Sequence, residues 1–132
     1  MTRRCILVVD DDLTNRLVVK VLLERRGFDI CEASSGAAAL DYLASEACDL
    51  VLMDLAMPGM DGFETTRRIR RLGGTAATVP IVALTAHTSG DERRACEECG
   101  MNGFLEKPFD LQAAMHTILF LLEERTLSRR AH

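Results

Sequence analysis

The sequence predicts an α/β domain in which a five-stranded parallel sheet is covered by helices on both faces. Short apolar runs alternate with longer amphipathic runs along the chain, as in repeated strand–helix units. The apolar runs show no polar alternation, which is typical of parallel strands that are buried on both sides. The chain has 132 residues, of which 48% are hydrophobic. These values suit one compact domain and exclude a disordered chain.

The first half of the chain contains three of the predicted strands. Gly27 is expected to end the first helix, because glycine often follows the last helical residue. Ser35 is a suitable N-cap for the second helix. The expected elements are a strand over 5–9, a helix over about 14–26, a strand over 28–33, a helix to about 44 and a strand over 50–53 that ends on Asp54.

The second half of the chain has the same alternation. Pro58, Gly59 and Gly62 predict a loop after the third strand, and Gly100 is expected to stop the fourth helix. Asp110 is a suitable cap for the last helix. The expected elements are a helix over 63–72, a strand over 81–84 that ends on Thr85, a helix over about 91–99, a strand over 103–105 and a helix to about 125. We expect one domain over residues 1–127 and a polar tail over 128–132.

The charge and hydropathy pattern excludes several classes of protein. The net charge is −4, so composition does not favour a nucleic-acid-binding surface. The cluster Arg67, Arg68, Arg70 and Arg71 is interpreted as a solvated helix face. The sequence has no apolar run of membrane length and no signal-peptide pattern. We therefore expect a cytoplasmic protein that contacts neither nucleic acid nor membrane directly.

The five cysteines favour reduced thiols over a disulfide framework, since their number is odd and most lie in apolar stretches. Cys96 and Cys99 form a C-x-x-C pair that could indicate a redox or zinc site. Zinc would need a second ligand pair at suitable spacing, and none is evident. The pair also lies in a predicted helix, where residues three apart are simply neighbours.

Polar side chains follow four of the predicted strands at the point where each strand ends. Asp10 and Asp11 follow the first strand, Asp54 ends the third, Thr85 ends the fourth, and Lys107 follows the fifth. The carboxyl ends of parallel strands meet at one edge of a sheet, where ligand sites form. The sequence therefore predicts that these residues converge on one crevice.

The chemistry of this cluster suits phosphoryl transfer. Three carboxylates brought together repel one another, and a divalent cation such as Mg²⁺ relieves that repulsion. A carboxylate is a competent nucleophile toward phosphorus. The resulting phosphoryl group carries negative charge that an ammonium group and a hydroxyl group can stabilise. Lys107 and Thr85 supply these groups, so Asp54 is the predicted acceptor.

Several motifs resemble the receiver domain of two-component response regulators. The motifs are ILVVDD at 6–11, DLAMPGMDG at 54–62, LTA at 84–86 and Lys107-Pro108. The resemblance covers about residues 4–124, and the stretches VPIVALTAH and GMDGFETTRRIR are most similar to receivers of hybrid sensor histidine kinases. It implies a doubly wound, flavodoxin-like (βα)5 fold with strand order 2-1-3-4-5. It also implies a Mg²⁺-dependent phosphorelay switch.

The resemblance assigns the phosphoacceptor and the metal ligands. Asp54 is expected to accept a phosphoryl group from a phosphohistidine on a histidine kinase or a histidine phosphotransfer protein. Asp11, Asp54 and the carbonyl of Ala56 are expected to bind Mg²⁺, with Mn²⁺ as a substitute. Asp10 is expected to hold the metal through water. Such a domain catalyses its own phosphorylation and dephosphorylation, but it is mainly a signalling switch.

The resemblance also assigns the residues around the phosphoryl group. Lys107 should contact its oxygens, and the amides of Ala56 and Ala86 should face it. Thr85 should hydrogen-bond the group and move toward it, while Phe104 turns inward. The Lys107-Pro108 peptide is expected to be cis.

Positions 56 and 87 tune the lifetime of the phosphoryl group in this family. Here they are Ala56, which cannot orient a water, and His87, which could reach the edge of the site.

Two surfaces are expected to contact partners. The first helix should meet the phosphodonor protein, with Val19 and Leu23 as candidate contacts. The last helix is more apolar than one buried face needs: Leu111, Met115, Ile118 and Leu122 form a stripe, and Ala114, Phe120 and Leu121 fall partly outside it. The resemblance allows a homodimer through this helix, and Leu121 is the residue chosen to test it.

Two other functions fit parts of the sequence. Asp10 to Thr14 reads D-x-D-x-T after a buried strand, which resembles the haloacid-dehalogenase phosphatases, with Asp10 as nucleophile. The chain is short for such an enzyme, and DLAMPGMDG would then have no role. The third alternative is an interaction module on the same fold that needs no phosphorylation. Such a module has no use for a cluster of carboxylates.

Overall fold

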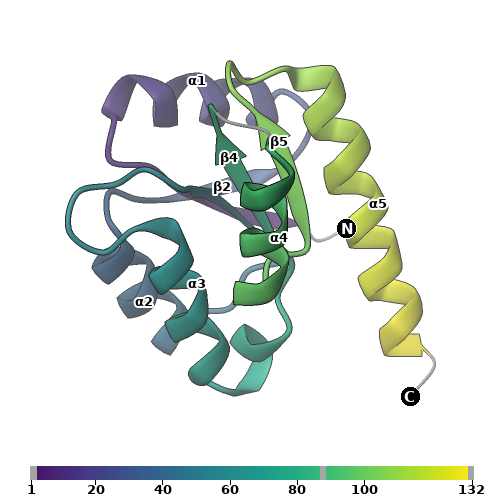
Figure 1. Ribbon diagram of the computed structural model, residues 1–132. Helices are drawn as coiled ribbons and strands as arrows, with labels where there is room; N and C mark the ends of the chain where they lie inside the picture. The colour runs from purple at the N-terminus through teal and green to yellow at the C-terminus, as the bar shows by residue number, and fades with distance from the viewer. Residues whose placement is uncertain (1–2, 87–88, 131–132) are drawn as a thin grey trace.

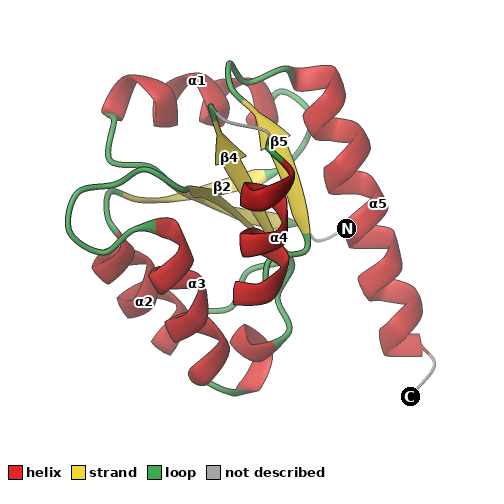
Figure 2. Ribbon diagram, in the orientation of Figure 1, coloured by secondary structure: helices red, strands yellow, loops and turns green. Residues whose placement is uncertain are grey.

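The computed structural model describes residues 3–86 and 89–130 and has the predicted alternation of strands and helices (Figures 1 and 2). The strands are β1 (Cys5–Val9), β2 (Asp29–Ala33), β3 (Leu50–Asp54), β4 (Ile81–Thr85) and β5 (Gly103–Glu106). The helices are α1 (Leu13–Glu24), α2 (Gly36–Ser45), α3 (Gly62–Arg71), α4 (Gly90–Cys99) and α5 (Leu111–Arg130), with a short 3-10 helix η1 (Gly74–Ala77).

The strands form one parallel sheet in the order β2-β1-β3-β4-β5, which confirms the predicted flavodoxin-like topology. Within this register Asp54 pairs with Leu84, and Thr85 pairs with Glu106 on the next strand. All five strands run in the same direction, so their carboxyl ends lie along one edge. The predicted site residues are brought to that edge by the topology.

The helices divide between the two faces of the sheet. Helices α1 and α5 pack on one face, where Leu23 and Ile118 are fully buried. Helices α2, α3 and α4 cover the other face, where Leu43, Ile69 and Cys96 are buried. Strands β1, β3 and β4 are buried almost throughout because both faces are covered.

The helix boundaries follow their capping residues. The side chain of Ser35 accepts a hydrogen bond from the amide of Ala38, as predicted for the start of α2. The carboxylate of Asp61 accepts from the amide of Glu64 and so begins α3. Gly100 adopts a left-handed conformation with φ of 111° after the last residue of α4, which confirms it as the stop.

Helix α5 is longer than predicted. It continues to Arg130 instead of ending near Arg125, so positions 128–130 of the expected tail are helical, whereas 131–132 lie outside the described residues. The segment is polar but holds no glycine or proline, and polar composition alone does not end a helix. Arg125 also holds α5 against the segment just before β3, because its guanidinium donates to the carbonyls of Cys48 and Asp49.

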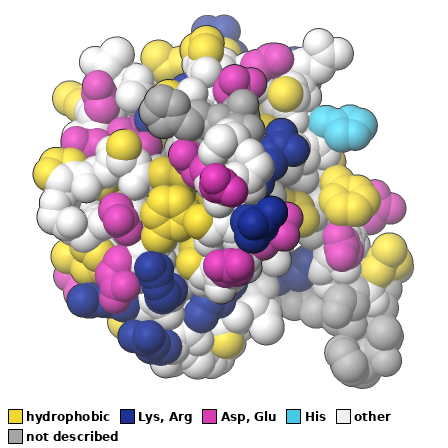
Figure 3. All heavy atoms as spheres, viewed as in Figure 1, with side chains coloured by type: hydrophobic (Ala, Val, Ile, Leu, Met, Phe, Trp, Pro, Cys, Tyr) yellow, Lys and Arg dark blue, Asp and Glu magenta, His cyan; other side chains and the backbone are white. Residues whose placement is uncertain are grey.

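The expected solvated face of α3 holds three arginines, and the fourth is a structural residue. Basic side chains gather over α3 in Figure 3, and Arg67, Arg68 and Arg71 are exposed. Arg70 instead donates to the carbonyls of Gly100, Ala76 and Val79 and to the side chain of Asn102. These bonds connect α3 to the ends of η1 and α4. The prediction that Arg70 is solvated was wrong.

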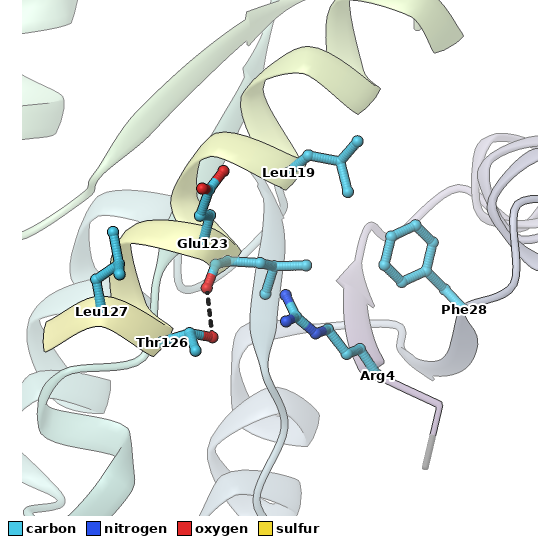
Figure 4. Close-up of a pocket in the computed structure, with 7 residues that line it drawn as sticks. Arg4, Phe28, Leu119, Glu123, Thr126 and Leu127 are labelled. Carbon is cyan, nitrogen blue, oxygen red and sulfur yellow. Dashed lines mark hydrogen bonds between the residues drawn. The ribbon is translucent and has the colours of Figure 1, made fainter. Parts of the chain in front are cut away.

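A pocket of about 470 Å³ lies beside the C-terminal half of α5 (Figure 4). Its lining includes Arg4, Phe28, Leu119 and Leu127. Arg4 and Phe28 precede β1 and β2, so the pocket lies at the amino ends of the strands, away from the predicted site. Within the described part of the chain, no helix combines the length and apolar character needed to cross a bilayer.

Candidate functional site

Asp54 is the centre of the polar cluster at the carboxyl edge of the sheet. It ends β3, and only 3% of its surface is exposed. Its Oδ1 atom accepts hydrogen bonds from Lys107 Nζ at 2.9 Å and from the amide of Ala56 at 3.2 Å. Gly62 allows the following loop to pack closely, because a Cβ there would lie 2.5 Å from the Asp54 carbonyl oxygen.

The carboxylates of Asp10 and Asp11 complete an acidic cluster with Asp54. One oxygen from each of the three groups lies within 4.8 Å of the others. Asp10 is buried, with 2% of its surface exposed, whereas Asp11 is exposed. The Asp10 side chain accepts from the amide of Asp12 at 2.9 Å, and its carbonyl accepts from Arg16 at 2.7 Å. These two bonds fix the loop that carries the acids.

The electrostatics of the cluster suit a hard divalent cation. Burial raises the pKa of Asp10 above the usual range for an aspartate, and the neighbouring Asp54 carboxylate raises it further. The Asp12 amide and Lys107 act in the opposite direction. Oxygen ligands at this spacing, one of them solvent-accessible, fit Mg²⁺, which binds carboxylates and keeps several waters. Among the described residues this is the one cluster of acids, histidines or cysteines with metal-ligand spacing.

Thr85 ends β4 at the carboxyl edge of the sheet, Phe104 lies on β5, and both contact α4. The hydroxyl of Thr85 donates to a carboxylate oxygen of Glu92. The guanidinium of Arg93 lies over the ring of Phe104, with Cζ 4.8 Å from the ring centroid. Sequence reasoning missed Glu92 and Arg93. Ser89 and Glu92 have the spacing of a capping box, which predicts a glutamate near the start of α4 but no contact with Thr85.

The other predicted site positions are two alanines, the Lys107-Pro108 peptide and His87. Ala56 and Ala86 follow β3 and β4 at the same edge of the sheet, and both are exposed. The Lys107-Pro108 peptide is cis, as expected. His87, the second position expected to tune phosphoryl lifetime, lies outside the described residues.

The C-x-x-C pair is part of the packing of α4. Cys96 is buried, and burial raises the pKa of its thiol to about 11. The thiol of Cys99 donates to the Cys96 carbonyl. Both cysteines are free thiols. These contacts support the interpretation of the pair as helical neighbours.

A groove runs from the acidic cluster along α1. It has a volume of about 440 Å³, and its lining includes Asp10, Val18, Lys107, Pro108 and Phe109. Its polar lining comes from Asp10 and Lys107, and its apolar lining includes Val18 and Phe109.

The structure corrects part of each predicted partner surface. On α1, Leu23 is fully buried against the sheet, and Val19 is also buried there, although it lines the groove beside α1. The exposed apolar residues of α1 are instead Leu13, Leu17, Val18 and Val21. On α5, Ala114 is fully buried and Leu121 packs partly into the core. Phe120 is exposed, as predicted, and the other exposed large apolar residues of this helix are Leu119 and Leu127. The apolar stripes in the sequence are wider than the buried faces, so periodicity did not distinguish their two sides.

Known proteins are similar to this chain in sequence and in architecture. The response regulator receiver domain family matches residues 6–119. Hybrid signal transduction histidine kinase E of Dictyostelium discoideum is 42% identical over 120 residues, which are 89% of this chain and 7% of that protein. Sensor histidine kinase RcsC of Salmonella typhi is 41% identical over 126 residues, which are 96% of this chain and 13% of that protein. The chain thus spans a small part of either kinase.

A solved structure gives the same result for the fold. It is the receiver domain of sensor histidine kinase PA1611 from Pseudomonas aeruginosa PAO1, with a magnesium ion coordinated in its active-site cleft. It has a TM-score of 0.84 and 30% identity, and the match covers 92% of this chain and 99% of that one. Because the family match covers most of the chain and both kinases exceed 40% identity, this chain belongs to the response regulator receiver domains of two-component systems.

Proposed function

We propose that this receiver domain accepts a phosphoryl group from a phosphohistidine onto the carboxylate of Asp54. The observation that carries the proposal is the position of Asp54 between Lys107 and the Ala56 amide, with Asp10 and Asp11 beside it. The carboxylate attacks phosphorus, the bond from phosphorus to the histidine nitrogen breaks, and the imidazole leaves. The product is an aspartyl phosphate on a side chain that is almost fully buried.

The surrounding groups support this reaction by electrostatic stabilisation. The ammonium of Lys107 is close enough to Asp54 to neutralise charge on the phosphoryl oxygens as they arrive. The Ala56 amide is a second donor, and we propose the Ala86 amide as a third. The hydroxyl of Thr85 is proposed as a further donor once it leaves Glu92, with Phe104 turning inward as it does so.

Mg²⁺ is the proposed cofactor, with Mn²⁺ as a substitute. Asp11, Asp54 and the carbonyl of Ala56 would hold it directly, and Asp10 would hold it through water. When bound, the ion supplies positive charge that offsets the three carboxylates and the incoming phosphoryl group. The magnesium ion in the related receiver of PA1611 supports this assignment.

The proposed partner is a histidine kinase or a histidine phosphotransfer protein. A phosphohistidine on such a protein must reach Asp54, and the groove beside α1 is lined by Lys107, which contacts Asp54. Exposed Val18 on α1 and the neighbouring Pro108 and Phe109 form the apolar side of this approach. The sequence also predicts a cytoplasmic location for this exchange.

The partner contact can be separated from the chemistry. Val18→Glu should slow phosphotransfer from a phosphorylated histidine phosphotransfer protein but leave phosphorylation by a small phosphodonor unchanged. Leu72→Glu is the matched control, because Leu72 is an exposed leucine at the end of α3. Equal transfer rates in wild type and Val18→Glu would place the contact elsewhere.

Self-association through α5 remains a prediction. If it occurs, it should bury the exposed side chains Leu119, Phe120 and Leu127 and not Leu121. Sedimentation of the wild type and of Phe120→Glu, with and without phosphorylation, tests this surface. If phosphorylation still increases the sedimenting mass of Phe120→Glu, self-association through this surface is excluded.

The two alternatives are less consistent with the geometry. A haloacid-dehalogenase-like phosphatase would use Asp12 as a general acid, but the Asp12 carboxylate caps α1 by accepting from the amides of Thr14 and Asn15. Lys107 contacts Asp54 and not the candidate nucleophile Asp10. A module that functions without phosphorylation would have no need of a buried carboxylate paired with a lysine.

Intact mass spectrometry tests the proposal. Wild type incubated with Mg²⁺ and a small phosphodonor should gain the mass of one labile phosphoryl group, and Asp54→Asn should gain none. Asp41→Asn is the matched control, since Asp41 is an exposed aspartate on α2. Continued phosphodonor turnover by Asp54→Asn, lost in Asp10→Asn, would favour the phosphatase. No gain in mass and no turnover with any donor, including a phosphohistidine protein, would exclude both functions.

A further inference from the structure

We propose that Glu92 and Arg93, in the first turn of α4, hold Thr85 and Phe104 in the resting arrangement and so set how readily the domain responds to phosphorylation. This inference rests on the proposed phosphorylation of Asp54. It assigns a positioning role to two residues outside the acidic cluster. Thr85 is held by a hydrogen bond and Phe104 by a cation–π contact, and the register of β4 and β5 places the two residues on one face.

The first contact competes directly with the phosphoryl group. Thr85 has a single hydroxyl proton, and it is donated to the carboxylate of Glu92. A phosphoryl oxygen on Asp54 would need the same proton. Both acceptors are anionic, so each forms a charge-assisted hydrogen bond of similar strength. The contact with Glu92 must therefore break before Thr85 can turn toward Asp54.

The position of Glu92 makes this contact well defined. Glu92 is half-buried, and its amide is bound to the side chain of Ser89, which caps α4. The backbone of Glu92 is therefore fixed, and its carboxylate reaches from α4 to the end of β4. Thr85 is buried at that end.

The second contact holds the neighbouring aromatic side chain. Arg93 lies over the ring of Phe104 at a distance typical of a cation–π interaction. A crevice of about 210 Å³ between α4 and β5 is lined in part by Arg93, Cys96, Gly103 and Phe104. The ring thus lies at the contact between α4 and the sheet, where displacement of either element changes its packing.

The strand register connects the two contacts. Thr85 pairs with Glu106, and Ala83 pairs with Phe104, in the parallel pair of β4 and β5. Residues two apart on a strand share a face, so Thr85 and Phe104 lie diagonally on the face that α4 covers. Glu92 and Arg93 are consecutive in one helical turn. A movement of that turn which releases Thr85 must therefore also change the contact with Phe104.

A direct consequence is that removal of Glu92 should favour the phosphorylated arrangement. A ligand shifts a two-state equilibrium only by its differential contacts, so a competing contact in the resting state weakens the response. Loss of one charge-assisted hydrogen bond from the resting state corresponds to roughly a tenfold change in the equilibrium. Glu92→Gln keeps an acceptor oxygen but loses the charge, so it should give a smaller change.

The experiment is a titration of the full chain with the phosphoryl mimic trifluoroberyllate in the presence of Mg²⁺, monitored through the NMR signals of α4 and of the Phe104 ring. Glu92→Ala should lower the midpoint concentration of the mimic about tenfold relative to wild type. Arg93→Ala should also lower this midpoint, and it should shift the Phe104 signals of the protein without the mimic. Glu98→Ala, which removes an exposed acid from the same helix, is the matched control for loss of charge.

A double-mutant cycle shows whether Glu92 acts through Thr85. In the Thr85→Ala background, Glu92→Ala should no longer change the midpoint, whereas a general charge effect would persist. The role of Glu92 is overturned if wild type binds the mimic and Glu92→Ala leaves the midpoint within about twofold of it, or if Glu98→Ala has the same effect. Failure of wild type itself to bind the mimic or to be phosphorylated would instead overturn the proposed function, and the role of Glu92 with it.

Discussion

Lys107 Nζ lies 2.9 Å from Asp54 Oδ1, although the two residues are 53 positions apart in the sequence. The contact joins the end of β3 to the loop after β5. The side chain of Asp54 is buried, whereas that of Lys107 is partly exposed to solvent. An incoming phosphoryl group would meet both charges at once.

The first prediction concerns this lysine. Lys107→Ala should slow phosphorylation by a small phosphodonor by about a hundredfold, because removal of one preorganised donor from a charged transition state has an effect of that order. The initial rate of mass gain measures it. Lys20→Ala is the control, since Lys20 is the only other lysine in the chain. It lies on α1 and forms an ion pair with Glu32 of β2. Equal rates in Lys107→Ala and wild type would contradict the role given to the ammonium.

The second prediction concerns the buried acid and the metal. Without metal, Asp10→Asn should raise the melting temperature by roughly 4 °C, since about 1 kcal/mol has that effect in a domain of this size. The reason is that burial next to Asp54 disfavours the ionised form of Asp10 and raises its pKa. Mg²⁺ should stabilise wild type more than Asp10→Asn. Asp41→Asn should match wild type in calorimetric scans with and without Mg²⁺. A fall in melting temperature for Asp10→Asn without metal would contradict the prediction.

The third prediction compares two glycines that begin helices. Gly62→Ala should destabilise the domain by about 1–3 kcal/mol, the range found for overpacked positions. The added Cβ would meet the Asp54 carbonyl oxygen at 2.5 Å. Gly90→Ala at the start of α4 should be neutral or slightly stabilising, because nothing lies within 4 Å of its Cβ position. Urea unfolding measures both, and equal midpoints would show that the loop after Asp54 can move away.

The fourth prediction tests the structural role of Arg70. Arg70→Met should destabilise the domain by about 2–4 kcal/mol, because it leaves several partly buried carbonyl acceptors without their donor. Arg71→Met is the control, and it should change stability by less than about 0.5 kcal/mol because Arg71 is exposed. Urea unfolding again gives the comparison. Similar losses in the two variants would mean that the contacts of Arg70 contribute little.

Much of the fold was predictable because its local signals agree with one another. The strand Cys5–Val9 was predicted residue for residue, and Ser35 and Gly100 mark helix ends through capping and backbone conformation. The short helix η1 was missed, because the glycines at 73 and 74 predict a break after α3 but no new helical turn. The C-terminal limit of α5 was missed because polar composition alone does not end a helix and no glycine or proline follows Arg125 before Arg130.

The candidate site was predictable to the extent that topology brings strand ends together. Asp10, Asp54, Thr85 and Lys107 were placed at one edge because each lies at the carboxyl end of a predicted parallel strand, and the structure has Asp54 in contact with Lys107. The contacts of Thr85 and Phe104 with α4 were not predictable. They depend on how one helical turn lies over the sheet, and no local pattern encodes that position.

The sequence by itself determined the element order, the parallel sheet and the acids at its carboxyl edge, because periodicity, capping and strand-end chemistry act over a few residues. Only the tertiary structure decided which side of each apolar helix is buried, which arginine of α3 is structural and which residues hold Thr85. Each of these depends on the packing of elements distant in the chain. Helical periodicity specifies an apolar stripe, but the neighbouring element decides how much of that stripe remains in contact with solvent.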